Sequence, residues 1–267
     1  MNAPLSLLKM RFLTGLQYRA AAAAGILTQL FFGLIFIMVY VAFYTHNGAA
    51  QPMSLKEVVA YVWLQQMFFA LIVLWQFDVE LFELITGGNI AYELCRPWRL
   101  YPIWYAKLLA ARLSSASLRC LPVALVVFIL PEPYRMPLPT SPAAFLLFTL
   151  ALLSGLLLVA AISMLVYISV FWTMSPVGSV LMIAVAGEFF AGMIVPVPLM
   201  PGWMQTIAGL LPFRWTVDFP FRVYTGHIGV QEAIAGIGIQ MIWLAVLAAA
   251  GQWLMGRALR RVVVQGG

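Results

Sequence analysis

The sequence is short of charged residues. Only 9% of its 267 residues are charged, whereas 64% are hydrophobic. Soluble domains contain about 25% charged and roughly 45–50% apolar residues. A globular core cannot hide so much apolar surface, so lipid must be the solvent for most of the chain. The scarcity of charge therefore excludes an ordinary soluble enzyme and predicts one integral membrane domain over residues 1–267.

Side chains suited to catalysis or metal binding are equally scarce. The two histidines, His46 and His227, fall in separate predicted outer loops. Cys95 is expected on the cytoplasmic side and Cys120 inside the membrane, so they should not pair. No cluster of His, Asp or Glu shares one predicted depth. We expect no catalytic residue, no metal site and no bound cofactor in this chain.

The sequence also lacks the GxxxxGK[ST] phosphate-binding loop. That loop cradles nucleotide phosphates with its backbone amides. We therefore expect no ATP site of this kind in the chain.

Long uncharged runs are what the sequence does contain. At about 20 residues per crossing, they predict an all-α fold with six transmembrane helices, over 20–44, 57–83, 104–130, 143–172, 177–195 and 232–256. Residues 4–18 repeat apolar side chains at helical spacing and predict an amphipathic helix in the membrane interface. No internal repeat is visible.

Lysine and arginine are divided unequally between the two predicted sides. If the N-terminus is inside, four basic residues lie outside (Lys56, Arg135, Arg214, Arg222) and ten lie inside (Lys9, Arg11, Arg19, Arg96, Arg99, Lys107, Arg112, Arg257, Arg260, Arg261). Positive residues favour the cytoplasmic side. The net charge of +6 is thus explained by topology rather than by nucleic acid. We expect both termini in the cytoplasm, in a membrane of the bacterial inner type.

Two charges fall within predicted spans. Arg119 is 11 residues before the outer end of the third span, and Glu188 is 11 residues after the inner start of the fifth. At 1.5 Å per residue, each lies roughly 16 Å from a membrane surface. A charge at that depth costs several kcal/mol unless it is paired or hydrated. The two groups could line a transport route, or form a structural ion pair or a subunit contact, and the sequence leaves these alternatives open.

Charges of opposite sign also gather near the predicted inner surface. Asp78, Glu80 and Glu83 end the second span, while Lys107 and Arg112 begin the third. They could meet across an antiparallel helix pair, or they could be solvated helix ends of little energetic weight.

The connection at 87–97 has a more specific pattern. Gly87 and Gly88 should stop the incoming helix. Residues 90–95 can form a short helix with Ile90 and Leu94 on one side and Glu93 opposite, and a proline follows it. A short helix with an exposed charge, held between two long helices, suits docking to a cytoplasmic partner.

The region 196–231 is unlike an ordinary loop. Its apolar part, Met204–Leu211, would extend only about 12 Å as a helix, which is too short to cross. It predicts a re-entrant or interfacial hairpin on the outer face. Its prolines and aromatic residues could anchor it at the interface or line the exit of a path.

Together these features resemble the membrane subunit of type-2 ATP-binding-cassette (ABC) exporters, in the branch of half-size permeases. The resemblance covers nearly the whole chain. It rests on the N-terminal helix, the six spans and two segments. The inner segment is Gly87-Gly88 with Leu94-Cys95-Arg96-Pro97, and the outer one is Gly192-Met193-Ile194-Val195-Pro196 with Leu199-Met200-Pro201-Gly202-Trp203 and Leu211-Pro212-Phe213-Arg214.

The resemblance implies partners and roles. Two permease subunits, identical or different, would form the path, and two ATPase subunits would bind ATP–Mg below them. Segment 87–97 would be the coupling helix, with Asn89, Glu93, Arg96 and Pro97 as its contacts. The hairpin would close an outer gate that includes Pro196, Pro201, Trp203, Pro212 and Arg214. The substrate classes implied are lipids, glycans, peptides and drugs.

One departure and two alternatives remain. The turn between the fourth and fifth spans is short and uncharged, so a second coupling contact is not expected there. An ion-coupled secondary transporter or channel would use Arg119 and Glu188 as coupling groups. A structural or assembly protein without transport is the third possibility.

Overall fold

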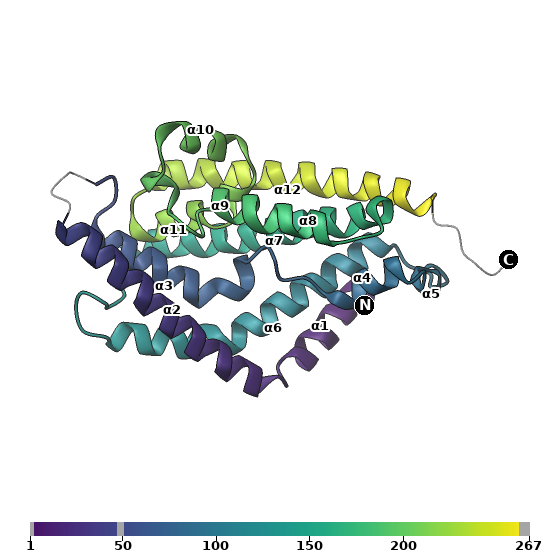
Figure 1. Cartoon of the computed structure of the whole chain (residues 1–267), viewed down its shortest axis with the longest axis horizontal. Coiled ribbons are helices and arrows are strands. Elements are labelled where there is room, and N and C mark those ends of the chain that lie inside the picture. The colour runs from purple at the N-terminus through teal and green to yellow at the C-terminus, as the bar shows by residue number, and fades with distance from the viewer. Residues whose placement is uncertain (1–2, 47–50, 262–267) are drawn as a thin grey trace.

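The fold is a bundle of long helices that run along one axis (Figure 1). The computed structural model describes residues 3–46 and 51–261, and every regular element in them is a helix. Five helices are long and apolar enough to span a membrane: α2 (Arg19–His46), α3 (Leu55–Ile72), α6 (Leu100–Ile129), α7 (Pro142–Thr173) and α12 (Val230–Leu259). The prediction of an all-α membrane protein is therefore confirmed, while the six-span topology is not.

The predicted span at 177–195 is shorter than a crossing helix. It consists of α8 (Val177–Met182), the π-helical turn η1 (Ile183–Gly187) and α9 (Glu188–Ala191). At 1.5 Å per residue, this segment extends roughly 22 Å, less than the ~30 Å apolar core of a bilayer. Gly192 ends it with a φ of 86°, a conformation that favours glycine.

The predicted span at 57–83 is not one continuous helix. Helix α3 ends at Ile72, and α4 (Val79–Thr86) begins after a non-helical stretch. The Asp78 carboxylate accepts a hydrogen bond from the Glu80 amide and so caps the new helix. We call the stretch 73–78 the α3 break. The apolar run hid it because hydrophobicity alone does not distinguish a helix from buried irregular backbone.

Helices α3 and α7 form the centre of the bundle. Within their most apolar windows, 72% of α3 and 56% of α7 are buried, against 17% for both α2 and α12. The outer helices thus direct most of their apolar side chains away from the protein. Such surface is stable only against lipid or another apolar chain.

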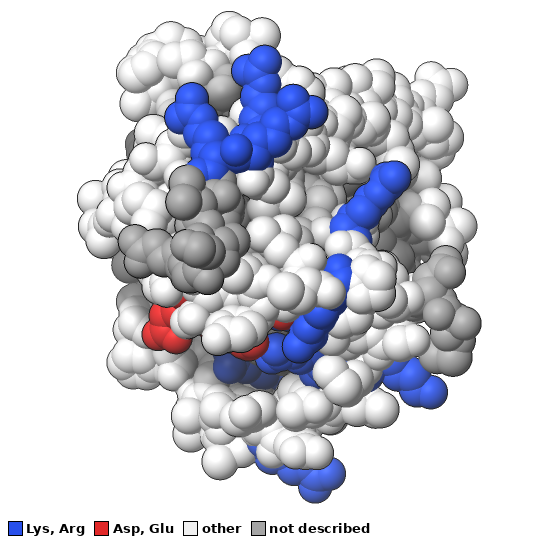
Figure 2. Space-filling view, turned by 90° about the vertical axis from the view of Figure 1, so that its right-hand side faces the viewer, with Lys and Arg blue, Asp and Glu red and all other residues white. Residues whose placement is uncertain are grey.

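The two ends of the bundle differ in charge. Helix α4, α5 (Ile90–Leu94) and the C-terminal part of α12 lie at one end (Figure 1). Figure 2 faces this end and shows many Lys and Arg side chains but few Asp or Glu. We call it the basic end. At the opposite end lie η2 (Val197–Leu199), α10 (Gly202–Leu210), η3 (Phe213–Trp215) and α11 (Asp218–Thr225).

The predicted N-terminal helix is present as α1 (Ala3–Gly15), and it packs against α6. A Cβ added to Gly15 would lie 2.2 Å from the Ser114 Oγ, so the absence of a side chain there permits the close approach. Leu5, Met10 and Leu13 are exposed on α1. Apolar side chains facing outward are what an interfacial helix requires, and its position at a membrane surface stays a prediction.

Candidate functional site

The segment after α4 has the predicted form of a stop followed by a short helix. The Gly87 amide donates to the Glu83 carbonyl at 2.9 Å and closes α4. Gly88 follows with a φ of 74°, which redirects the chain at little steric cost. Helix α5 then runs from Ile90 to Leu94, between α4 and α6.

The exposed face of α5 differs from the prediction. Glu93 is only 8% exposed, whereas Tyr92 is 74% exposed and Leu94 is exposed as well. Ile90 is buried among apolar residues of α4 and α6. Ile90 and Leu94 therefore do not share one side, and Glu93 faces inward. The expectation of an exposed carboxylate was wrong, because packing of Ile90 fixes the rotation of this one-turn helix.

The other predicted coupling residues do lie at the surface. Asn89, Arg96 and Pro97 are exposed. The Arg96 guanidinium lies 3.7 Å from the Glu93 carboxylate and 5.1 Å from the centre of the Trp98 ring. The exposed face of this segment is thus aromatic and cationic, and the buried Glu93 lies next to the Arg96 guanidinium.

The α3 break is held from one side by Arg112. This side chain on α6 is 2% exposed. Its Nη1 donates to the carbonyls of Leu71 at 3.3 Å and Val73 at 2.7 Å. Its Nη2 donates to the Gln76 carbonyl and the Ser163 hydroxyl, both at 3.3 Å. Arg112 therefore satisfies carbonyls that an intact helix would have bonded internally.

Glu188 holds the same break from another side. Its carboxylate accepts a hydrogen bond from the Leu74 amide at 3.1 Å. Glu188 follows the π-helical turn η1 directly, and such turns are frequent at functional sites. Arg112 thus donates hydrogen bonds to carbonyls of the break, while Glu188 accepts a hydrogen bond from its Leu74 amide. This arrangement is a reasonable way to keep irregular backbone inside a membrane.

The predicted pair of Arg119 and Glu188 is not formed. Arg119 has no carboxylate within 4.0 Å in the part of the chain that the structure describes. A Cβ added to Gly25 on α2 would lie 2.6 Å from the Arg119 Cζ, so the guanidinium lies against α2 instead. The similar predicted depths of Arg119 and Glu188 did not imply contact between them, because Glu188 is hydrogen-bonded to the α3 break instead.

The charges predicted to meet near the inner surface do so in part. Glu80 on α4 binds the Arg11 Nη2 at 2.9 Å and lies 3.9 Å from the Lys107 Nζ. Burial acts to raise the pKa of the Glu80 carboxyl, but the Arg11 hydrogen bond and the two positive charges outweigh it and hold that pKa below its usual value. Arg112 does not belong to this group, because its side chain is hydrogen-bonded to the α3 break.

A buried carboxylate organises the opposite end. Asp218 is fully buried, and it accepts hydrogen bonds from the Val197 amide at 3.2 Å and from Arg222 at 3.4 Å. Tyr61 on α3 donates to the Gly192 carbonyl at 3.1 Å and reaches Asp218 at 3.4 Å. Burial raises the pKa of Asp218, although Arg222 acts to lower it. These bonds attach the region after Gly192 to α3.

The predicted gate residues surround this network rather than form one cluster. Pro196 precedes η2, Pro201 precedes α10 and Pro212 precedes η3. Trp203 is exposed on α10. The Arg214 guanidinium lies over the Trp215 ring at 4.9 Å. The three prolines thus stand directly before three of the short helices at this end, whereas α11 follows Val217.

An apolar cavity of about 380 Å³ lies beside this region. It is lined by residues of α2 and α3 and by the stretch after Gly192, including Tyr40, Gln65, Met193 and Pro196. Of the predicted gate residues, Pro196 alone lines it.

Two buried charges that hold irregular backbone, Arg112 and Asp218, and the helix α11 are not among the sequence-based predictions. A signal for Asp218 existed, because it stands among Val217, Phe219 and Phe221 with Arg222 four residues later. A carboxylate in an apolar run with a cation at i+4 predicts a buried pair. No comparable signal marks Arg112, since the α3 break that it serves is not visible in the residue pattern.

Comparison with known families decides the class of this fold. A model of the ABC-2 family transporter proteins matches residues 30–266. The chain belongs to the ABC-2 transporter family. It is therefore a membrane transport component, a multi-pass permease of the ABC type, and the family implies ATPase partner subunits. No curated protein and no solved structure matches this ABC-2 permease significantly.

Proposed function

We propose that this permease forms part of an export path and is driven by separate ATPase subunits that dock on α5 at the basic end. The observation that carries the proposal is the exposed aromatic and cationic face of α5, formed by Tyr92 and Arg96. Aromatic residues and arginine are the side chains most enriched at the centres of protein interfaces. The basic end would then be cytoplasmic, in agreement with the positive-inside rule.

The path from α5 to the membrane interior is short. Helix α5 follows α4 after three residues, and α4 begins at the α3 break. A force on Tyr92 would therefore reach irregular backbone held largely by side chains, which is easier to rearrange than an intact helix. We infer that α4 and α5 move together and that the α3 break absorbs the motion, with Arg112 and Glu188 as its two supports.

The opposite end would form the outer gate. The Asp218 network attaches the stretch from Gly192 to α11, and opening would require its bonds to Tyr61 and Val197 to break or shift. Lipids, glycans, peptides and drugs remain the substrate classes proposed from family resemblance. The exposed apolar faces of α2 and α12 leave surface for a second permease, identical or different.

Purification from native membranes tests the docking surface. We expect Tyr92→Ala combined with Arg96→Ala to lower the ATPase activity that co-purifies with the full-length chain at least fivefold, because interface centres carry most of the binding energy. Recovery of the folded permease should not change, since both side chains are exposed.

The matched control is Met174→Ala. Met174 is exposed in the turn between α7 and α8, where no docking is expected, so co-purified ATPase activity should equal that of the wild type. Equal activity in the α5 variant and the control would contradict the docking role of α5. Absence of any co-purifying ATPase from wild-type membranes would contradict the proposed function as a whole.

A further inference from the structure

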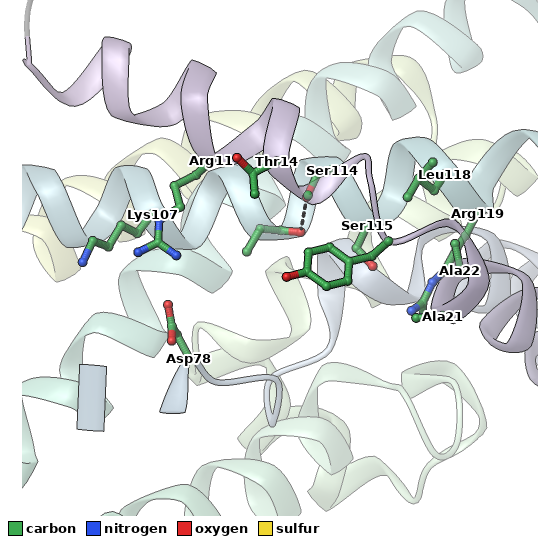
Figure 3. Close-up of a pocket in the computed structure, with 13 residues that line it drawn as sticks. Arg11, Thr14, Ala21, Ala22, Asp78, Lys107, Ser114, Ser115, Leu118 and Arg119 are labelled. Carbon is green, nitrogen blue, oxygen red and sulfur yellow. Dashed lines mark hydrogen bonds between the residues drawn. The ribbon is translucent and has the colours of Figure 1, made fainter. Parts of the chain in front are cut away.

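A cavity of about 280 Å³ lies between α1, the start of α2, α6 and Asp78 at the end of the α3 break (Figure 3). Three cations line it, Arg11, Lys107 and Arg119, together with the carboxylate of Asp78. Hydroxyl side chains, including those of Tyr18 and Ser115, line other parts of its wall.

The charges of this cavity do not cancel. Arg11 and Lys107 both contact Glu80. With Asp78 nearby, two carboxylates balance these two cations. Arg119 has no carboxylate partner among residues 3–46 and 51–261, and its Nε is buried without a hydrogen-bond partner. The uncompensated positive charge therefore belongs to Arg119, and a partly buried cation without a carboxylate partner favours a ligand of opposite charge.

The depth of Arg119 fits a lipid headgroup better than the middle of the bilayer. Its guanidinium lies beside Gly25, the sixth residue after the start of α2 at Arg19. Six residues of helix correspond to about 9 Å. The 16 Å estimated from the sequence used the far end of α6, which at 30 residues is longer than a crossing helix needs to be.

The surroundings of the cavity are apolar and exposed. Leu13 on α1, Phe32 on α2 and Leu125 on α6 are exposed hydrophobic side chains. Phe32 is seven residues from Gly25 and Leu125 is seven residues from Leu118, which lines the cavity, so each lies on the same helix face two turns away. An anion attached to hydrocarbon chains would satisfy both Arg119 and these faces. A free anion would leave the apolar faces uncovered.

We propose that this cavity binds the phosphate of an anionic membrane phospholipid, with Arg119 as the anion-binding residue. The lipid is a bound component of the permease rather than its cargo, and it fastens α1 and α2 to α6. Basic pockets between membrane helices commonly hold anionic headgroups in this way. The proposal holds whichever substrate is exported and whichever ATPase drives export.

Lipid titration of the full-length chain tests the proposal. The protein is delipidated in neutral detergent and titrated with phosphatidylglycerol, phosphatidylcholine or inorganic phosphate, and bound molecules are counted by native mass spectrometry. We expect one phosphatidylglycerol to bind about tenfold more tightly than phosphatidylcholine, and inorganic phosphate at millimolar concentration neither to bind nor to displace it.

Three variants assign the site. Arg119→Gln should weaken the binding of phosphatidylglycerol about tenfold, while Arg119→Lys should retain most of it, because the charge is kept. Arg260→Gln removes an exposed cation at the end of α12 and should have no effect. Elution of each variant as a single symmetrical peak shows that it is folded, so that a change in lipid binding is measured on folded protein.

Three results would overturn the proposal. The first is equal binding of phosphatidylglycerol by wild type and Arg119→Gln. The second is equal weakening in the Arg260→Gln control, which would indicate general attraction of anionic lipid. The third is binding of inorganic phosphate as tight as that of the lipid, which would make this a small-anion site.

Discussion

Arg112 and Arg119 lie seven residues apart on α6, almost on the same face of one helix, yet they are used in opposite ways. Arg112 donates to three carbonyls and a hydroxyl in and around the α3 break. Arg119 lies against Gly25 of an intact helix, which offers no free carbonyl. The residue type alone does not decide the role of either cation. The state of the neighbouring backbone does.

This comparison distinguishes charged side chains that hold the fold together from a charged side chain that has no partner within the chain. Arg112 and Glu188 both form hydrogen bonds to the backbone of the α3 break. Arg119 has no carboxylate partner among the described residues, and we propose that its charge binds a ligand. The largest effects of mutation should therefore appear at the α3 break and the smallest at exposed ion pairs.

Arg112→Leu should be the most damaging change. It leaves the carbonyls of Leu71, Val73 and Gln76 without this donor in an apolar setting, and loss of one partner of a buried charged contact costs about 3–5 kcal/mol. We expect little folded protein by fluorescence-detected size-exclusion chromatography and a sharply lower midpoint of thermal unfolding. Arg119→Leu is the matched control and should keep most of its stability. Equal losses in the two variants would refute the distinction between the two arginines.

Asp218→Leu should come next. It removes the acceptor of the Val197 amide and strands the Arg222 guanidinium, at about 2–4 kcal/mol. Because burial raises the pKa of Asp218, the neutral Asp218→Asn variant should lose clearly less, since its amide oxygen still accepts. Thermal unfolding in detergent measures both. An asparagine variant as unstable as the leucine variant would show that the charge itself is required.

Glu188→Leu should have a moderate effect. The Leu74 amide loses its acceptor, and an unsatisfied buried donor costs about 1–3 kcal/mol. Glu188→Gln keeps an acceptor oxygen and should be more stable than Glu188→Leu. If the charge were part of a transport route, both variants would retain stability but lose transport alike. Measuring unfolding and transport on the same pair of variants therefore separates support of the α3 break from passage of an ion.

Acid should have the smallest effect, at the contact between α1 and α4. The folded-state pKa of Glu80 is lowered, so its contribution is present above the unfolded pKa near 4.3 and is lost as the pH falls through the lower folded value. The pair is half exposed and contributes less than about 1 kcal/mol. Hydrogen exchange in α1, corrected for intrinsic rates, should increase below about pH 4. The increase should be absent in Glu80→Gln, where exchange is already faster at pH 7.

Much of the fold was predictable because lipid imposes a simple pattern. Apolar runs located all five spanning helices, and most of the predicted helix ends lie within a few residues of the observed ones. Gly87 and Gly88 correctly placed the end of α4. The α3 break was not predictable, since residues 73–77 are mostly apolar, as in a helix, and the groups that stabilise the break come from α6, α7 and α9. The shortness of the fifth segment was hidden for a similar reason, because apolar residues continue past its end at Gly192.

The surface position of segment 87–97 was predictable, but the side chains that it exposes were not. The exposure of Arg96 and Pro97 agrees with the prediction of a contact surface at 87–97. The rotation of α5 depends on whether Ile90 or Leu94 enters the core, and the sequence offers both. In the structure Ile90 packs into the core, so that Glu93 faces inward and Tyr92 is exposed. Arg119 and Glu188 show the same limit, since equal depth says nothing about which helix each one faces.

Cross-linking at Cys95 tests the central claim most directly. Cys95 is exposed beside α5, while Cys120 is partly buried. In native membranes, a short bifunctional reagent carrying a thiol-reactive group should join Cys95 to an ATPase subunit. Cys95→Ser should abolish the product, and Met174→Cys in that background should not restore it. Cross-linking from Cys95 alone is the result that docking on α5 predicts, and an ATPase that co-purifies but never cross-links to Cys95 would contradict it.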